Sequence, residues 1–134
     1  MHKPRVRRKR TERPDQRELL VWFKAHQRLG IVVMHVPNED TSGAGYGSHV
    51  ARMKDGMLPG APDLWFFERD PTVIKGMGTR VWCLEMKDQD GELNDNQEKL
   101  HPQLRRCGID VQTAFSLEEA KAVVRAWGLV SLGA

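Results

Sequence analysis

Two short apolar segments in the middle of the chain each bring a carboxylate, and this feature most constrains the fold. Leu64 to Phe67 comes directly after Pro62-Asp63, and Val81 to Lys87 holds Glu85 among apolar neighbours. Both segments are rich in aromatic or β-branched residues, and a connection punctuated by Pro and Gly joins them. The sequence therefore predicts two neighbouring strands that each deliver one carboxylate.

The spacing within the second segment places a cation beside its carboxylate. Residues i and i+2 of a strand point to the same side, so Glu85 and Lys87 project together, and the neighbouring strand can bring Asp63 alongside. One carboxylate from each strand can then share a divalent ion, for which Mg²⁺ is the natural choice because it prefers oxygen ligands. Such an ion polarises a phosphate and lowers the pKa of a bound water, while Lys87 holds that water or offsets developing charge.

The two motifs, Pro-Asp and Glu-x-Lys, are not specific by themselves. Each occurs a second time in the chain, at Pro14-Asp15 and at Glu119-Ala120-Lys121. For Glu85 and Lys87 an ordinary ion pair at a strand end is an equal alternative. A dense cluster of acidic residues that contains only one cationic side chain, Lys87, favours the metal-binding interpretation, because a bound cation would relieve the repulsion between the carboxylates. Its members are Glu85, Asp88, Asp90, Glu92, Asp95 and Glu98.

Periodicity and capping signals predict helices and strands around this pair. Asp15 with Glu18 resembles a capping box that opens a helix ending at Gly30, and Asn94 with Gln97 opens another that runs to about Cys107. A buried strand is expected at 31–36, a flexible loop at 38–47, a short helix at 48–55, a strand at 111–115 and a last helix capped by Ser116.

Two of these capping residues are also candidates for the site. Glu18, on the first helix, is placed to complete the acidic cluster, although its capping role is the favoured interpretation from sequence alone. Gln97 has the same ambiguity, because it stands at the third helical position of the second capping box.

Charge and composition limit the kinds of partner that this chain is expected to bind. The net charge is +3, yet residues 1–13 alone contribute +6 and the rest −3. A basic arm at 1–13, followed by one domain at 14–134, suits contact with nucleic acid, with a solvated tail as the alternative. The candidate contacts in the arm are Arg5, Arg7, Arg8, Lys9 and Arg10. No apolar run is long enough to span a membrane and Cys83 and Cys107 suit reduced thiols, so we expect a cytoplasmic protein, bacterial or encoded by a phage.

The chain resembles the PD-(D/E)XK nucleases, and specifically the small stand-alone members of the virus-type replication-repair nuclease (VRR-NUC) family. The resemblance covers about residues 15 to 127. It rests on Gly60-Ala61-Pro62-Asp63-Leu64, Trp82-Cys83-Leu84-Glu85-Met86-Lys87, Leu93 with Gln97, Leu104, and Gly108-Ile109-Asp110-Val111.

This resemblance implies an α/β, restriction-endonuclease-like core, with a central mixed sheet of about four strands flanked by helices. It implies that Asp63, Glu85 and the Met86 carbonyl bind Mg²⁺, with Mn²⁺ as a substitute, and that Lys87 is the catalytic lysine. Glu18 would be the helix-borne acid, which could reach the metal through water, and Gln97 an accessory residue. Asn38 matches an Asn-rich turn that would lie close to the site and to DNA.

The expected activity is that of a structure-selective DNA endonuclease similar to Holliday junction resolvases, acting as a homodimer on branched or four-way junction DNA. Three alternatives remain open. The same domain in larger repair nucleases cuts flaps as a monomer, the fold could serve as a non-catalytic nucleic acid binding module, and a restriction-type enzyme would read sequence. No recognition domain is visible for the last of these.

Overall fold

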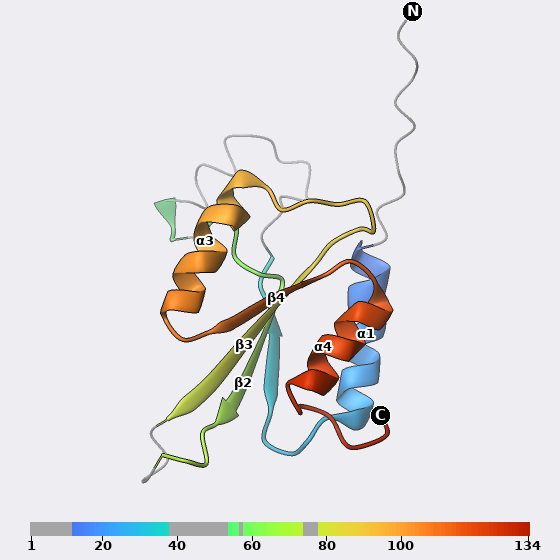
Figure 1. Ribbon diagram of the computed structural model, residues 1–134. Helices are drawn as coiled ribbons and strands as arrows, with labels where there is room; N and C mark the ends of the chain where they lie inside the picture. Colours follow the sequence, from blue (N-terminus) through green and yellow to red (C-terminus); the bar gives the residue numbers. More distant parts are fainter. Residues whose placement is uncertain (1–11, 38–53, 57, 74–77) are drawn as a thin grey trace, which may run out of the picture.

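The structure, a computed structural model, describes residues 12–37, 54–56, 58–73 and 78–134. Within these residues a four-stranded sheet separates α3 from α1 and α4, which lie side by side on the opposite face (Figure 1). In chain order the elements are α1 (Glu12–His26), β1 (Val32–His35), β2 (Leu64–Arg69), β3 (Thr79–Met86), α3 (Asp95–Arg106), β4 (Asp110–Ala114) and α4 (Leu117–Ala126).

The sheet is mixed, as predicted. Its strand order is β1-β2-β3-β4; the pairs β1–β2 and β2–β3 are antiparallel, and β4 runs parallel to β3. In the β2–β3 register Leu64 lies opposite Leu84. Continuing this register by one step places Asp63 opposite Glu85, and residues directly opposite in an antiparallel pair have neighbouring side chains.

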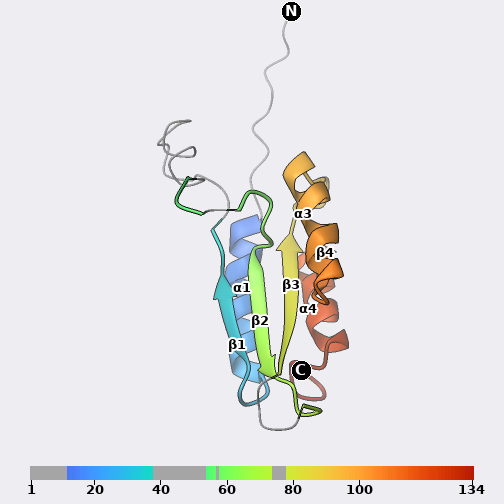
Figure 2. The same cartoon turned by 90° about the vertical axis from the view of Figure 1, so that its left-hand side faces the viewer.

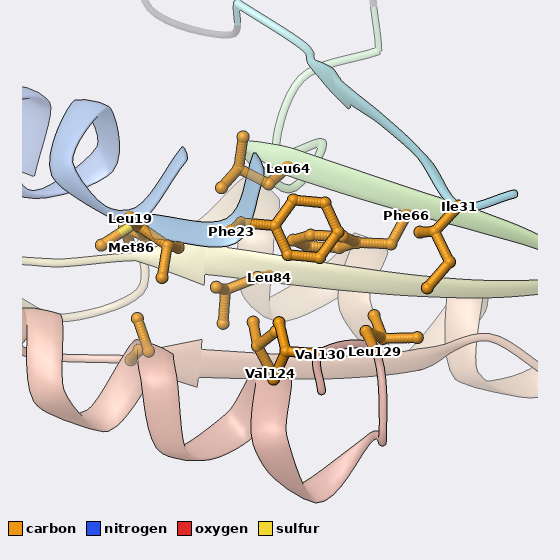
Figure 3. Close-up of a cluster of buried hydrophobic side chains, with 12 residues drawn as sticks. Leu19, Phe23, Ile31, Leu64, Phe66, Leu84, Met86, Val124, Leu129 and Val130 are labelled. Atoms are coloured by element: carbon orange, nitrogen blue, oxygen red, sulfur yellow. The ribbon is translucent and has the colours of Figure 1, made fainter. Parts of the chain in front are cut away.

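The hydrophobic core lies between the sheet and the α1–α4 face. Phe23 of α1 meets Phe66 of β2 edge to face, with ring centroids 5.1 Å apart. Leu19, Leu84 and Val124 are fully buried in the same cluster (Figure 3). Because alternate strand residues point to opposite faces, Leu84 and Met86 turn into this core while Glu85 turns to the α3 face.

Helix α1 begins earlier than the sequence predicted, at Glu12, so the expected capping box at Asp15 is wrong: Asp15 lies inside the helix. Pro14 does not prevent this start, because proline is tolerated in a first turn whose backbone N–H groups have no helical partner. The helical unit thus includes the last two residues assigned to the basic arm. The helix also ends at His26, before the predicted stop at Gly30.

The prediction that β1 is a buried strand is also wrong. Val32 is 61% exposed and Met34 45% exposed, and only Val33 of this strand packs against the core. The reason is the position of β1 at the sheet edge, where it pairs with no described strand other than β2 (Figure 2). A run of β-branched residues predicts a strand, but it does not predict whether both faces of that strand are buried.

The helices around the site follow their local signals. Asn94 and Gln97 form a complete capping box at the start of α3, and Ser116 caps α4 by accepting from the Glu119 N–H. Helix α3 is continuous through Pro102. The predicted loop at 38–47, the helix at 48–55 for most of its length, and Asn38 lie outside the described residues, as do all the basic residues of 1–11.

Two predictions from the overall composition, on membrane spans and on the cysteines, can be compared with the structure. Within the described ranges, no helix has the length and apolarity needed to cross a membrane. Cys83 and Cys107 are both free thiols, the first buried in β3 and the second exposed after α3. Burial raises the pKa of the Cys83 thiol to about 12, which keeps it protonated and unreactive.

Candidate active site

A tight turn carries Asp63 into the site. Gly60 has φ +89°, and a Cβ added there would lie 2.5 Å from the backbone carbonyl of Asn96 at the start of α3. Only glycine allows this approach, which packs the turn directly against the helix. Pro62 is buried at the end of the turn, and its carbonyl accepts a hydrogen bond from the Trp65 indole at 3.1 Å. The turn therefore fixes where the backbone of Asp63 lies.

Asp63 is tied to both neighbouring strands. Its Oδ2 accepts a hydrogen bond from the Met86 N–H at 2.8 Å, and its carbonyl accepts one from the Val36 N–H at 2.8 Å. The first bond joins the start of β2 to the end of β3, beside Glu85. The structure thus confirms that adjoining strands bring the two predicted carboxylates together.

Glu85 is almost completely buried, with 2% of its surface exposed. Its Oε1 accepts a hydrogen bond from Gln97 Nε2 at 2.6 Å and lies 3.5 Å from Lys87 Nζ. Its Oε2 has no hydrogen-bond partner among the described residues. A carboxylate held on one oxygen and buried with the other unpaired is unusual, because unsatisfied buried polar atoms cost free energy.

The electrostatics of the pair follow from this burial. Burial, reinforced by the nearby Asp63 carboxylate, raises the pKa of Glu85 to about 8, and Lys87 only partly offsets the rise. When Glu85 ionises, two carboxylates face one ammonium, and one negative charge is left uncompensated. A strongly shifted carboxyl of this kind is a candidate functional group.

These residues fit a divalent cation. The donors are hard carboxylate oxygens: Glu85 has an unpaired oxygen, Oε2, and lies near the Asp63 carboxylate. Within the described ranges no group of three or more His, Cys, Asp or Glu side chains is placed to hold a metal. Any cation here would therefore complete its shell with backbone oxygen, water and substrate, as Mg²⁺ commonly does.

The other predicted site residues differ in how close they lie to the carboxylate pair. Gln97 lies in the site, whereas Glu18 is exposed on α1 and is not gathered with the carboxylate pair into an acidic cluster. A water-mediated role for Glu18 stays a prediction. The Met86 backbone lies at the end of β3 beside both carboxylates, and its role as a ligand stays a prediction too.

Sequence reasoning missed two histidines next to the site. His35 Nδ1 lies 3.1 Å from Gln16 Nε2 and 3.1 Å from the Asp63 carbonyl, linking α1 to the turn. His101 is 1% exposed on α3 and lies one turn after Gln97. The i, i+4 spacing of Gln97 and His101 was the available signal for the second, because such residues share a helix face.

The mixed sheet, with helices on both faces and a carboxylate pair at the β2–β3 junction, has the architecture expected of a restriction-endonuclease-like core. Among solved structures, the chain matches one described as a "VRR_NUC domain", with a TM-score of 0.52 and 20% sequence identity, covering 89% of this chain and 99% of that one. The predicted resemblance to the VRR-NUC family is thus confirmed at the level of the fold. No family model and no curated protein matches the chain.

Proposed function

We propose that this protein is a metal-dependent nuclease that hydrolyses phosphodiester bonds in DNA. The observation that carries the proposal is the buried Glu85 carboxylate, with one oxygen held by Gln97 and the other unpaired beside Asp63. A structural ion pair with Lys87 alone would not leave a buried carboxylate oxygen without a partner. The VRR_NUC-like fold supports the same class of activity.

Each residue of the site has a distinct part in this proposal. Asp63, Glu85 and the Met86 carbonyl would hold Mg²⁺ or Mn²⁺, which supplies Lewis acid activation of the phosphate and of a bound water. Lys87, whose side chain is only 9% exposed, orients the attacking water or stabilises charge on the scissile phosphate. Gln97 fixes the Glu85 carboxylate, while Glu18 and Asn38 are proposed to act at the periphery of the site.

The proposed substrate is branched DNA, with a four-way junction as the leading candidate and a homodimer presenting two sites to it. This part rests on the sequence resemblance to stand-alone VRR-NUC proteins and on the +6 charge of residues 1–13. Basic side chains release counterions from phosphates, so binding through them is expected to weaken steeply with salt.

The direct test is incubation of the purified protein with four-way junction, flap and linear duplex DNA in Mg²⁺. Cleavage of the junction before the others supports the full proposal, and cleavage of the flap by a monomer supports the monomeric alternative. Absence of cleavage for all three, in Mg²⁺ and in Mn²⁺, would falsify the nuclease proposal. Light scattering with and without junction DNA measures the oligomeric state.

The charge of the arm favours a second candidate, a nucleic acid binding module without catalysis. Deletion of residues 1–11 separates the two, since α1 begins at Glu12 and the helix is left whole. A pure binder is expected to lose most of its affinity and its salt dependence. A nuclease is expected to keep metal-dependent cutting at low salt.

A further inference from the structure

His101 is buried on the face of α3 that also carries Gln97, with only 1% of its surface exposed. Neither ring nitrogen has a hydrogen-bond partner among the described residues. Gln97, one turn earlier, has both halves of its amide bonded. Two unpaired nitrogens on one buried ring are rare in native proteins, and each such group calls for an explanation.

The groups around the ring have complementary hydrogen-bonding roles. Burial first, and then the charge of Arg105, lower the pKa of His101; the Gly60 backbone opposes this and Lys87 adds to it. The ring is therefore neutral, with one N–H donor and one bare nitrogen that accepts. The Gly60 carbonyl can only accept and the Lys87 ammonium can only donate. A neutral imidazole can donate to the first and accept from the second.

We propose that His101 is a positioning residue of the active site: its imidazole donates to the Gly60 carbonyl and accepts from the Lys87 ammonium when substrate is bound. The inference rests on the proposed nuclease function. Hydrogen bonds of a catalytic site are often long or misaligned without substrate and tighten in the complex, which accounts for the unpaired nitrogens of the free protein.

This arrangement gives α3 two contacts with the reacting groups. Gln97 holds Glu85, and His101, one turn later, holds Lys87 and the turn that carries Asp63. Gly60 packs closely on the α3 backbone, so the turn lies against the helix that carries the ring. One face of α3 thereby positions Asp63, Glu85 and Lys87.

His101→Leu tests the proposal, with His101→Gln as the conservative variant and His26→Leu as the matched control. Leucine fills the buried space without polar atoms, so its thermal midpoint is expected to equal or exceed that of wild type. Its kcat on junction DNA is expected to fall about 10–100-fold with little change in KM, because outer partners of catalytic groups act at this level. Glutamine restores part of kcat, and His26→Leu cuts normally.

Two outcomes overturn the inference while leaving the nuclease proposal intact: His101→Leu cuts as fast as wild type, or its loss of activity merely follows a loss of folded protein. A spectroscopic experiment tests the contact even if the wild-type protein proves inactive. The ¹⁵N shifts of the His101 ring, measured with junction DNA in Ca²⁺, are expected to differ between wild type and Lys87→Met. Identical shifts contradict the contact with Lys87 whatever the activity.

Discussion

Glu85 makes the stability of the metal-free protein depend on pH in a predictable direction. Burial and Asp63 raise its pKa from 4.5 to about 8 in the folded chain. The folded state therefore keeps a proton that the unfolded state releases, so the free energy of unfolding falls as pH rises through this window. From the two pKa values, the loss between pH 5 and pH 8 is about 3 kcal/mol.

The assay is urea denaturation in EDTA across this pH range, for wild type and for Glu85→Gln. Glutamine cannot ionise, so the variant is expected to lack this component and to become the more stable protein at the alkaline end. Glu98→Gln, which removes an exposed glutamate of α3, serves as the control and should follow wild type. Adding Mg²⁺ at the alkaline end should raise the stability of wild type and not of Glu85→Gln, since only a deprotonated ligand binds metal.

Parallel pH profiles for wild type and Glu85→Gln would refute the reasoning. They would mean that Glu85 ionises in the folded protein as easily as in the unfolded chain. In that case the carboxylate is solvated or fully paired, and the unpaired Oε2 no longer argues for a cation.

Three further changes test other parts of the site. Lys87→Ala is expected to abolish cutting while junction binding, measured by gel shift, stays within a few fold of wild type; normal activity would move the catalytic lysine elsewhere. Gly60→Ala should destabilise the fold by about 2 kcal/mol or more, because it combines a positive φ with a backbone clash, whereas Gly128→Ala, with open space around it, should cost only about 1 kcal/mol in urea denaturation. Gln97→Leu should cost about 1–3 kcal/mol, because Glu85 Oε1 loses its hydrogen bond and keeps only the 3.5 Å contact with Lys87 Nζ, and it should reduce kcat; unchanged values for both would show that the amide is not needed.

Local signals predicted the parts of the fold whose causes are local. The caps of α3 and α4, at Asn94 and Ser116, depend on side chains within three residues of the helix start, and the structure has both. Asp15 shows the limit of such signals, since the same pattern occurs inside α1, where the preceding residues continue the helix. The exposure of β1 was missed for a different reason, because an edge position depends on the order of the strands in the whole sheet.

The carboxylate pair was predictable because strand alternation and antiparallel pairing place Asp63 and Glu85 together almost without choice. Glu18 and His101 were not, since the sequence does not state how a helix is rotated about its axis or how far along the sheet it lies. The structure leaves Glu18 exposed and buries His101 near Lys87. Residues on helices thus needed the tertiary packing before their roles could be weighed.

Gln97 depends on both local and tertiary structure. The sequence left it as either a helix cap or a site residue, and in the structure it makes the contacts of both. Its Oε1 accepts from the Asn94 N–H at 2.9 Å while its Nε2 donates to Glu85 at 2.6 Å. A glutamate completes a capping box equally well, but it has no N–H to donate and would bring another negative charge to a carboxylate already crowded by Asp63. Of the two residues that suit this helical position, only glutamine can both start α3 and hold the buried carboxylate of the site.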